Sequence, residues 1–594
     1  MYWPVLFAFV DAACAKPPRG GGRPPIGGGS HHHHISPDDG CKAFPGTDSW
    51  PSRETWSRLN QTLGGKLLAP TPPAAACHKE QATFDLNLCA SIGKEWTDDA
   101  FHTENPISSM WQQYNNDTCL PSQDTPCSPT GYPAYVVDAR SASDVKKGID
   151  FAREHNIRVV VKSTGHDYQG RSQAPGSLSI WVHNMQSRSD VFKSFRPKGC
   201  NFDIDGTAVT VGGGSQVGNI VDALDKINQT IVGGTSKSVS VGGYLTGGGH
   251  SVLAQLYGMG ADQVLEMEVV TAQGDILVAN ECQNKDLFWA MRGGGGSTFG
   301  VMTSVTLKTH PTPKVVAANL AIASLDLSAP WVWDMAGYIL SQFPYLDKHG
   351  VSGYSVASAN YSVPAGDKMI NVAGVAGEFI LPNSQSKEEM QAIWDPIIAH
   401  VNTTWPDAVA LVDLIPYPSF ASWLDIYTLK DPVGYDLWVG SHLLDEASLT
   451  ANSTAVGEAF KVFGGQAFLV SGNGTRNAKP RGGSNSISPS WRQSVIHATT
   501  GLSAPFLDLS GRKEVLAAVN AKTEPLRKLA PNMGSYLNEN NPEEPNWQTS
   551  FWGDNYDRLL QIKGAVDPND VFWCHPCVGN DRWETHGYRL CPVV

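Results

Sequence analysis

The chain has 594 residues, of which 41% are hydrophobic, and a formal net charge of −13 at pH 7. A chain of this length can bury a large core and is expected to divide into two or more domains. Its basic residues are scattered, so we expect no binding of nucleic acid or of an anionic membrane. Beyond residue 15, no apolar run approaches the roughly 18 residues of a membrane span.

Residues 1–15 resemble a signal peptide, because an apolar stretch ends in Ala13-Cys14-Ala15, although a basic start is missing. Removing this segment would leave ten cysteines, an even number that suits an oxidising compartment. Seven Asn-x-Ser/Thr sequons agree with secretion, at Asn60, Asn116, Asn228, Asn360, Asn402, Asn452 and Asn473. We therefore expect a secreted glycoprotein with five disulfides, whose connectivity the sequence does not specify.

Residues 16–40 form a Pro/Gly-rich linker that we expect to be disordered. The run from His31 to His34 could bind a metal, but a low-complexity or tag-like segment is the favoured interpretation. Residues 41–128 are a Cys-rich lead-in, in which Ser52 caps a short helix and four of the five cysteines are expected to pair locally.

From residue 129 onward strands alternate with helices. Tyr135–Val137 reads as a strand, and residues 143–155 carry apolar side chains at the spacing of an amphipathic helix. Residues 267–278 predict a hairpin that turns at Gln-Gly-Asp. A Rossmann fold is not indicated, because no G-x-G-x-x-G with the required strand, helix and acidic residue is present.

The β-branched run Val159–Val161 predicts a buried strand that ends in a loop of small and polar residues. This loop runs Lys162, Ser163, Thr164, Gly165, His166, Asp167, Tyr168 and closes at Gly170. Successive backbone N–H groups in such a loop can bind one anion, such as a diphosphate. A single loop histidine is more often a surface residue, so the motif needs further support.

Two glycine clusters supply part of that support. Gly242 and Gly243 are followed closely by Gly247, Gly248 and Gly249. Glycine lets the backbone lie against a flat ligand where a Cβ atom would collide. We therefore predict that both clusters form a wall of the ligand site.

Residues 132–145, 157–185, 241–262 and 286–301, in this order, resemble the FAD-binding domain of vanillyl-alcohol oxidase and para-cresol methylhydroxylase, in its berberine-bridge-enzyme-like branch. The opening at residue 41 is similar to the fungal isoamyl-alcohol-oxidase-like subgroup. The resemblance implies an α+β fold. It has a PCMH-type FAD-binding domain of two α/β subdomains at 129–312 and a substrate domain at 313–530 with an antiparallel sheet over the flavin. A closing segment at 531–594 returns to the flavin.

The resemblance also implies the cofactor site. His166 takes the place of the histidine that bonds covalently to the flavin 8α carbon, and the loop and glycine residues above contact FAD. Ser236 stands where many relatives have a cysteine that forms a second bond, so attachment through His166 alone is expected. Val239 matches the position that controls access of O2, and a valine there implies an oxidase.

The proton acceptor is implied by the motif Tyr536-x-Asn538, with Asn540 as a further orienting residue. An unperturbed tyrosine titrates near 10, so Tyr536 would need a neighbouring donor or positive charge. The alternative is that Tyr536 only packs beside the flavin. Cys574 and Cys577 flank a histidine, but no second ligand pair lies at zinc spacing, so we expect a disulfide and no metal. Residues 474–488 read as a mobile loop.

The favoured function is a secreted FAD-dependent oxidase that takes hydride from an alcohol, carbohydrate or phenolic carbon and releases H2O2. A small-molecule substrate and O2 are its expected partners, and a monomer is expected. One alternative is a tailoring dehydrogenase or oxidative cyclase of secondary metabolism, which O2 would reoxidise slowly. The other is a flavin-loaded binding protein without turnover. The sequence does not name the substrate.

Overall fold

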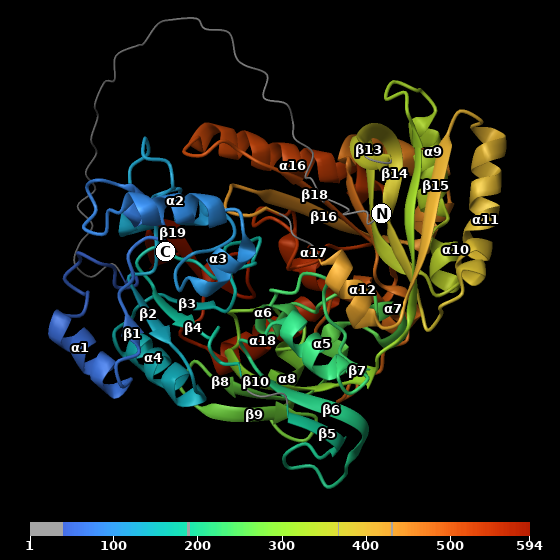
Figure 1. Cartoon of the computed structure of the whole chain (residues 1–594). Coiled ribbons are helices and arrows are strands. Elements are labelled where there is room, and N and C mark those ends of the chain that lie inside the picture. The colour runs from blue at the N-terminus through green and yellow to red at the C-terminus, as the bar shows by residue number, and fades with distance from the viewer. Residues whose placement is uncertain (1–39, 187–189, 366–367, 429–431, 594) are drawn as a thin grey trace, which may run out of the picture.

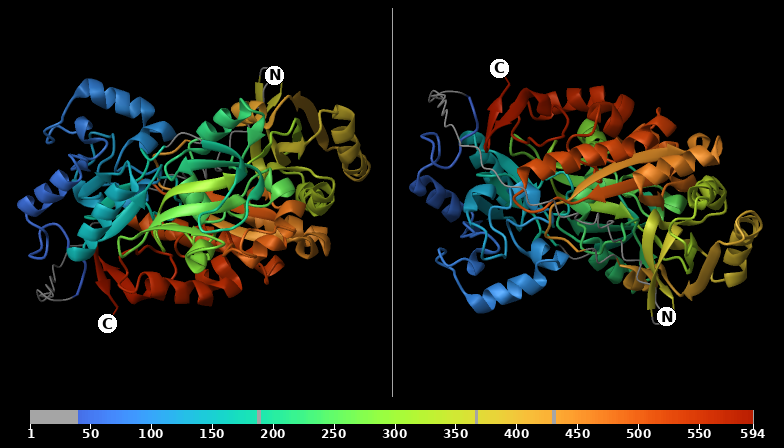
Figure 2. Two further views of the ribbon diagram at one scale, coloured as in Figure 1. Left: turned by 90° about the horizontal axis from the view of Figure 1, so that it is seen from below. Right: turned by 90° about the horizontal axis from the view of Figure 1, so that it is seen from above.

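The computed structural model describes residues 40–186, 190–365, 368–428 and 432–593. The predicted signal peptide, His31–His34 and the linker up to residue 39 lie outside the described residues. Figure 2 shows the lead-in in blue at one end of the molecule and the yellow and gold helices of residues 332–404 at the other. In the part of the chain that is described, no helix combines the length and apolar character needed to cross a bilayer.

The first sheet carries the predicted loop at the end of one of its strands. Its order is β1-β2-β4-β3, with β2, β4 and β3 parallel and β1 antiparallel to β2. The strands are β1 (Leu67–Leu68), β2 (Tyr135–Asp138), β3 (Val159–Lys162) and β4 (Leu178–Trp181). Helix α4 (Ala142–Glu154) begins after its cap Ser141 and buries Val145, Ile149 and Ala152 against this sheet, as predicted.

The second sheet is antiparallel in the order β5-β6-β10-β8-β9. Its strands are β5 (Asp190–Phe195), β6 (Ile204–Gly212), β8 (Val264–Val270), β9 (Ile276–Asn280) and β10 (Val301–Lys308). The predicted hairpin is confirmed as the pair β8 and β9. Helices α5 (Val217–Asp225) and α6 (Val241–Thr246) pack their apolar residues into a core that this sheet shares.

A seven-stranded antiparallel sheet forms the other half of the molecule, in the order β15-β12-β14-β13-β17-β18-β16 (Figure 1). The strands are β12 (Val315–Ser324), β13 (Ser352–Ala365), β14 (Lys368–Pro382), β15 (Val409–Tyr417), β16 (Trp438–Asp445), β17 (Gly465–Leu469) and β18 (Ser494–Leu502). Along β12, Val316 and Ala318 join one core and Val315 and Ala317 the other, as alternating strand faces require.

The first of these cores lies under helices that cover the outer face of the sheet. They are α9 (Val332–Ser341), α10 (Phe343–Lys348), α11 (Lys387–Thr404), α14 (Ser453–Phe463) and the end of α16 (Leu509–Leu529). The opposite face contributes Tyr354 and Phe468 to the core that contains Tyr536. The predicted fold class is therefore confirmed, with an antiparallel sheet facing the half of the molecule that contains the first two sheets.

The C-terminal segment returns to the first two sheets through α17 (Trp547–Trp552) and α18 (Tyr556–Val566). Lys563 on α18 donates to the carbonyl oxygen of Thr298 at 3.0 Å, and its Nζ lies 2.6 Å from Asp567. Phe572 forms a parallel bridge to Val159 of β3. The segment thus packs directly against the strand that leads into the His166 loop.

All ten cysteines that follow residue 15 are paired. The pairs are Cys41–Cys591, Cys77–Cys89, Cys119–Cys127, Cys200–Cys282 and Cys574–Cys577. Four of the five lead-in cysteines pair locally, as predicted. The fifth joins the beginning of the described chain to its end.

The prediction of a mobile loop at 474–488 is wrong, because helix α15 (Gly472–Arg476) covers its start and side-chain hydrogen bonds hold its second half. Arg292 donates to the carbonyl oxygens of Arg481 and Ser484, and Asn485 donates to Asp262 at 2.7 Å. Ile487 is buried in the core of the second sheet. Polar, glycine-rich composition indicated exposure, but distant side chains fix this segment.

Candidate active site

A cavity of about 290 Å³ lies between the two halves of the molecule. The seven-stranded sheet contributes Tyr354, Gln466, Phe468 and Thr499 to its lining. The cavity brings together most of the site residues that were predicted from the sequence. These are Ser163, Thr164, Gly165, His166, Asp167, Tyr168, Ser236, Val239, Gly242, Gly243, Tyr536 and Asn538.

The lead-in holds the His166 loop in place through its backbone. Met110 donates its N–H to the carbonyl oxygen of Gly165 at 3.2 Å, and the Trp111 indole donates to that of His166 at 3.3 Å. Trp111 also stacks on Tyr168, with ring centroids 4.9 Å apart. The loop is therefore built by two segments that are far apart in the sequence.

The His166 imidazole is held within the cavity by a hydrogen bond. Its Nε2 atom lies 2.8 Å from Oγ of Ser238, whose hydroxyl in turn donates to the carboxylate of Asp99. Burial lowers the pKa of His166 to about 4, against the opposing effect of Asp99. His166 is therefore neutral at physiological pH and keeps a free lone pair. Neither Asp99 nor Ser238 was predicted, because nothing in their local sequence marks them.

Two loop residues that we predicted to bind cofactor do not line the cavity. Lys162 is buried, and its Nζ donates to the carbonyl oxygens of His102 at 3.2 Å and Asn105 at 2.8 Å. Burial also lowers the pKa of Lys162 to about 7. Gly170 is needed because a Cβ atom would lie 2.3 Å from the Tyr114 ring. Both residues therefore stabilise the loop through contacts outside the cavity.

The two glycine clusters have different roles. A Cβ atom on Gly243 would meet nothing within 4 Å, and Gly243 lines the cavity. A Cβ atom on Gly247 would lie 2.1 Å from the Asn538 side chain, and one on Gly249 would lie 2.6 Å from the Tyr244 ring. Gly247, Gly248 and Gly249 do not line the cavity, so the predicted wall is limited to the first cluster. In the second cluster, the absence of a Cβ atom leaves room for the side chains of Asn538 and Tyr244.

Tyr536 and Asn538 form one hydrogen-bonded unit. The Tyr536 oxygen accepts from the N–H of Gly249 at 3.1 Å and from Nδ2 of Asn538 at 3.0 Å. Burial, together with the negative charge of Glu539, raises the pKa of Tyr536, and the two donors act against that rise. Two neighbouring donors are therefore present, but they do not bring the pKa of Tyr536 below its ordinary value. Asn540 is buried, does not line the cavity and accepts a hydrogen bond from the N–H of Asn541.

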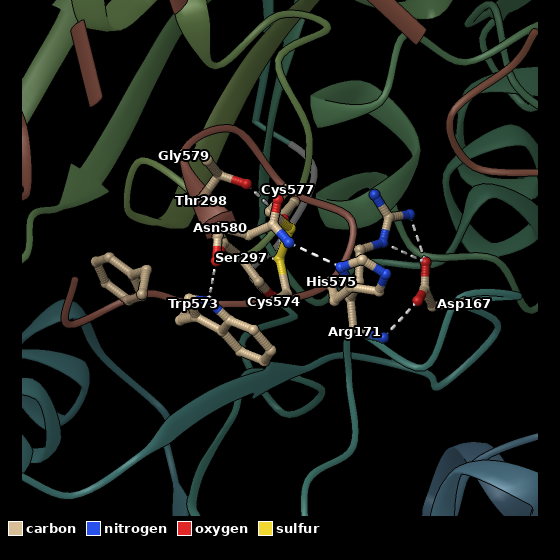
Figure 3. Close-up of a disulfide and its surroundings, with 12 residues drawn as sticks. Asp167, Arg171, Ser297, Thr298, Trp573, Cys574, His575, Cys577, Gly579 and Asn580 are labelled. Atoms are coloured by element: carbon tan, nitrogen blue, oxygen red, sulfur yellow. Dashed lines mark hydrogen bonds and ion pairs between the residues drawn. A yellow bond between two sulfur atoms is a disulfide. The ribbon is translucent and has the colours of Figure 1, made fainter. Parts of the chain in front are cut away.

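Arg171 connects this unit to the His166 loop. Its guanidinium pairs with Asp167, Nε to Oδ1 at 2.8 Å, and donates to Oδ1 of Asn538 at 3.0 Å. Figure 3 shows the Asp167–Arg171 pair near the disulfide between Cys574 and Cys577. Arg171 lines the cavity but was not among the predicted residues.

A cluster of three ionisable side chains beside Tyr536 was not predicted from the sequence. Glu539 binds two imidazoles, with Oε1 2.8 Å from Nε2 of His250 and Oε2 2.8 Å from Nε2 of His497. Burial acts to raise the pKa of Glu539, but His250 and His497 hold it well below its usual range. The three groups lie close enough to hold a cation, yet hydrogen bonds already engage both carboxylate oxygens. His250 and Glu539 each follow a predicted motif directly, whereas His497 has no sequence signal.

The cavity has the features that FAD requires. The hydroxyl groups of Ser163 and Ser172 line it, are buried and have no hydrogen-bond partner among the described residues. Free hydroxyls beside the loop that follows β3 suit a diphosphate, and the bare backbone at Gly243 suits a flat ring. The residues present therefore fit the cofactor.

Comparison with known proteins decides the family. Two family models match, described as FAD binding domain over residues 133–280 and as Berberine and berberine like over residues 535–579. The FAD-linked oxidoreductase apf9 of Gibberella fujikuroi is 34% identical over 582 residues, which cover 93% of this chain and 96% of that protein. The chain belongs to the VAO-type FAD-linked oxidoreductases.

Solved structures of this family agree with the fold. That of the VAO-type flavoprotein MtVAO713 from Myceliophthora thermophila C1 is 30% identical, with a TM-score of 0.85 over 93% of this chain and 100% of that one. The glucooligosaccharide oxidase of Acremonium strictum shares the fold at 18% identity, with a TM-score of 0.57 over 75% of this chain and 92% of that one. This VAO-type protein is an FAD-dependent oxidoreductase, as the sequence predicted.

Proposed function

We propose that this VAO-type protein is a secreted oxidase that binds FAD covalently through His166. It takes hydride from a carbon that bears a hydroxyl group, in an alcohol, carbohydrate or phenolic substrate, and passes the electrons to O2. The observation that carries the proposal is the placement of Tyr536 in the same cavity as His166, with two donors on its oxygen. Bound FAD supplies the hydride acceptor.

Attachment through one bond rests on two residues. The glucooligosaccharide oxidase carries a 6-S-cysteinyl, 8α-N1-histidyl FAD. In this chain His166 lines the cavity and supplies the imidazole, but Ser236 supplies no sulfur for a second bond. A single histidyl bond is the arrangement that these side chains support.

Tyr536 is the proposed acceptor of the substrate hydroxyl proton, a role that requires its ionised form even though burial and Glu539 raise its pKa. The N–H of Gly249 and the amide of Asn538 stabilise negative charge on its oxygen, because both donate to it. Asn538 is held in the required orientation by Arg171, which donates to its Oδ1. The ionised Glu539 opposes a second negative charge nearby, so proton transfer and hydride transfer are expected to be closely linked.

Electron transfer to O2 and secretion have separate support. Val239 lines the cavity and is a small apolar residue at the position that implies O2 access in relatives. The five disulfides suit an oxidising compartment. Five of the sequon asparagines are exposed: Asn228, Asn360, Asn402, Asn452 and Asn473.

A peroxide-release screen tests the oxidase function. The purified yellow protein is incubated in air with alcohols, oligosaccharides and phenols, and flavin bleaching is followed in parallel without oxygen. An oxidase releases H2O2 with at least one substrate that also bleaches the flavin. Anaerobic bleaching followed by slow reoxidation in air would indicate a dehydrogenase instead. A flavin that no candidate bleaches would contradict the proposal.

A further inference from the structure

We propose that Asp99 and Ser238 form a relay that fixes the protonation of His166 and removes its proton when the bond to FAD forms. This inference rests on the proposed covalent attachment. It assigns a positioning function to two residues that touch neither the Tyr536 unit nor the Glu539 cluster. One of them belongs to the Cys-rich lead-in.

The hydrogen bonds determine which imidazole nitrogen carries the proton. The Ser238 hydroxyl donates its only proton to Asp99, so its oxygen must accept from Nε2 of His166, 2.8 Å away. A neutral imidazole has one N–H group, which therefore lies on Nε2. The lone pair is left on Nδ1, the atom that can attack carbon.

The same arrangement places a base at the end of the chain of hydrogen bonds. A carboxylate that orients an imidazole through one nitrogen makes the other nitrogen a better nucleophile. Asp99, Ser238 and His166 all belong to this connected set, and Asp99 and His166 both line the cavity. Ser238 transmits the effect of Asp99 because it can donate and accept at the same time.

The lead-in is anchored so that Asp99 reaches this position. Asp99 is the first residue of α3 (Asp99–Glu104), and the side chain of Asp98 caps that helix by accepting from the N–H of Ala100. At the other end of α3, Lys162 donates hydrogen bonds to the carbonyl oxygens of His102 and Thr103. The buried Lys162 thus ties the helix that carries Asp99 to the strand that carries the His166 loop.

A bond would form between Nδ1 of His166 and the 8α carbon of the flavin, while one C–H bond of that methyl group breaks, its proton passes to solvent and its electron pair is taken up by the flavin. The proton on Nε2 moves to Ser238, and the Ser238 proton moves to Asp99. Dioxygen then takes two electrons and two protons, leaves as H2O2 and returns the flavin to its oxidised form.

The test measures attachment and not turnover. The full chain and its variants Ser238→Ala and Asp99→Asn are purified and incubated with added FAD in air. Total bound flavin and the fraction that remains with acid-precipitated protein are followed over time. Both variants should bind FAD but attach it roughly 10²-fold or more slowly, the contribution expected of a positioned acid–base group.

Two matched variants separate the relay from simple structural support. Asp98→Asn removes a neighbouring carboxylate on the same helix and keeps a good helix cap, so attachment should proceed as in the parent. Ser238→Thr keeps the hydroxyl and should restore attachment to within a few-fold. If Ser238→Ala fails to fold, Asp99→Asn still decides the matter.

The outcomes are distinct. Attachment at the parent rate in a folded Ser238→Ala or Asp99→Asn protein would overturn the relay. Equal slowing by Asp98→Asn would overturn it too, since the effect would then come from the helix. A parent protein that never holds flavin covalently would contradict the proposed attachment itself and not the relay alone.

Discussion

The guanidinium of Arg171 donates a 3.0 Å hydrogen bond to Oδ1 of Asn538, a residue 367 positions away in the sequence. Arg171 also pairs with Asp167, which directly follows His166. The loop that holds the cofactor and the segment that accepts the substrate proton are therefore one hydrogen-bonded structure.

Tyr536→Phe tests the proton acceptor. The variant keeps the ring, which packs edge-on against Trp491 with centroids 5.3 Å apart, and removes the titratable oxygen. Flavin reduction by substrate without oxygen should slow by roughly 10²–10⁴, the usual loss for a positioned general base. Covalent attachment should survive, because Arg171 still holds Asn538. Anaerobic stopped-flow bleaching is the measurement, and reduction within a few-fold of the parent would return Tyr536 to a packing role.

Glu539→Gln is expected to destabilise the protein at neutral pH by roughly 1.5–3 kcal/mol, as when hydrogen bonds to a charged group are lost. The folded pKa of Glu539 lies below the unfolded value, so its contribution is present above the unfolded pKa, near 4.3. That contribution is lost as pH falls toward the folded pKa. Denaturant unfolding at pH 7 and pH 4 should therefore show a smaller difference between parent and variant at pH 4. A constant difference would contradict the ionic pairing with His250 and His497.

Glu378 on β14 should show the opposite pH dependence. Burial raises the pKa of Glu378 to about 7, although the Trp423 indole donates to it. Its contribution to stability is complete below the unfolded pKa and is lost as pH rises through about 7. Glu378→Gln keeps an acceptor for Trp423, so relative to the parent it should gain roughly 3 kcal/mol between pH 4.5 and pH 8. No relative gain over that range would show that Glu378 is already ionised when folded.

The mature protein should contain no reactive thiol. All ten cysteines beyond residue 15 are paired, including Cys41 with Cys591 across 550 residues. Thiol titration of denatured, unreduced protein should give none, and peptide mapping should recover the five pairs. Two or more reactive thiols per chain would contradict full pairing.

Sequence motifs predicted those parts of the site that depend on local chain geometry. The strand Val159–Val161, the His166 loop and Gly243 all occupy the expected places, because strand propensity and the absence of a Cβ act locally. A Cβ atom on Gly247 would collide with Asn538, and Gly247 does not line the cavity. A local pattern shows that space is needed without showing what fills it.

The residues that were missed depend on contacts between distant segments. Asp99 reaches His166 through Ser238, a residue 139 positions away. His497 lies in the middle of β18, where its sequence context is that of an ordinary strand. Only the packing of the seven-stranded sheet against the C-terminal segment brings it to Glu539. Such pairings follow from topology, which local motifs do not contain.

The most direct test of the account is to locate the flavin. The purified protein and the variant His166→Ala are precipitated with acid, and the parent is digested for peptide mapping. We predict that the parent pellet stays yellow, that the flavin maps to the peptide containing His166, and that the variant releases its FAD into the supernatant. Flavin found wholly in the parent supernatant, or on a peptide without His166, would contradict the account.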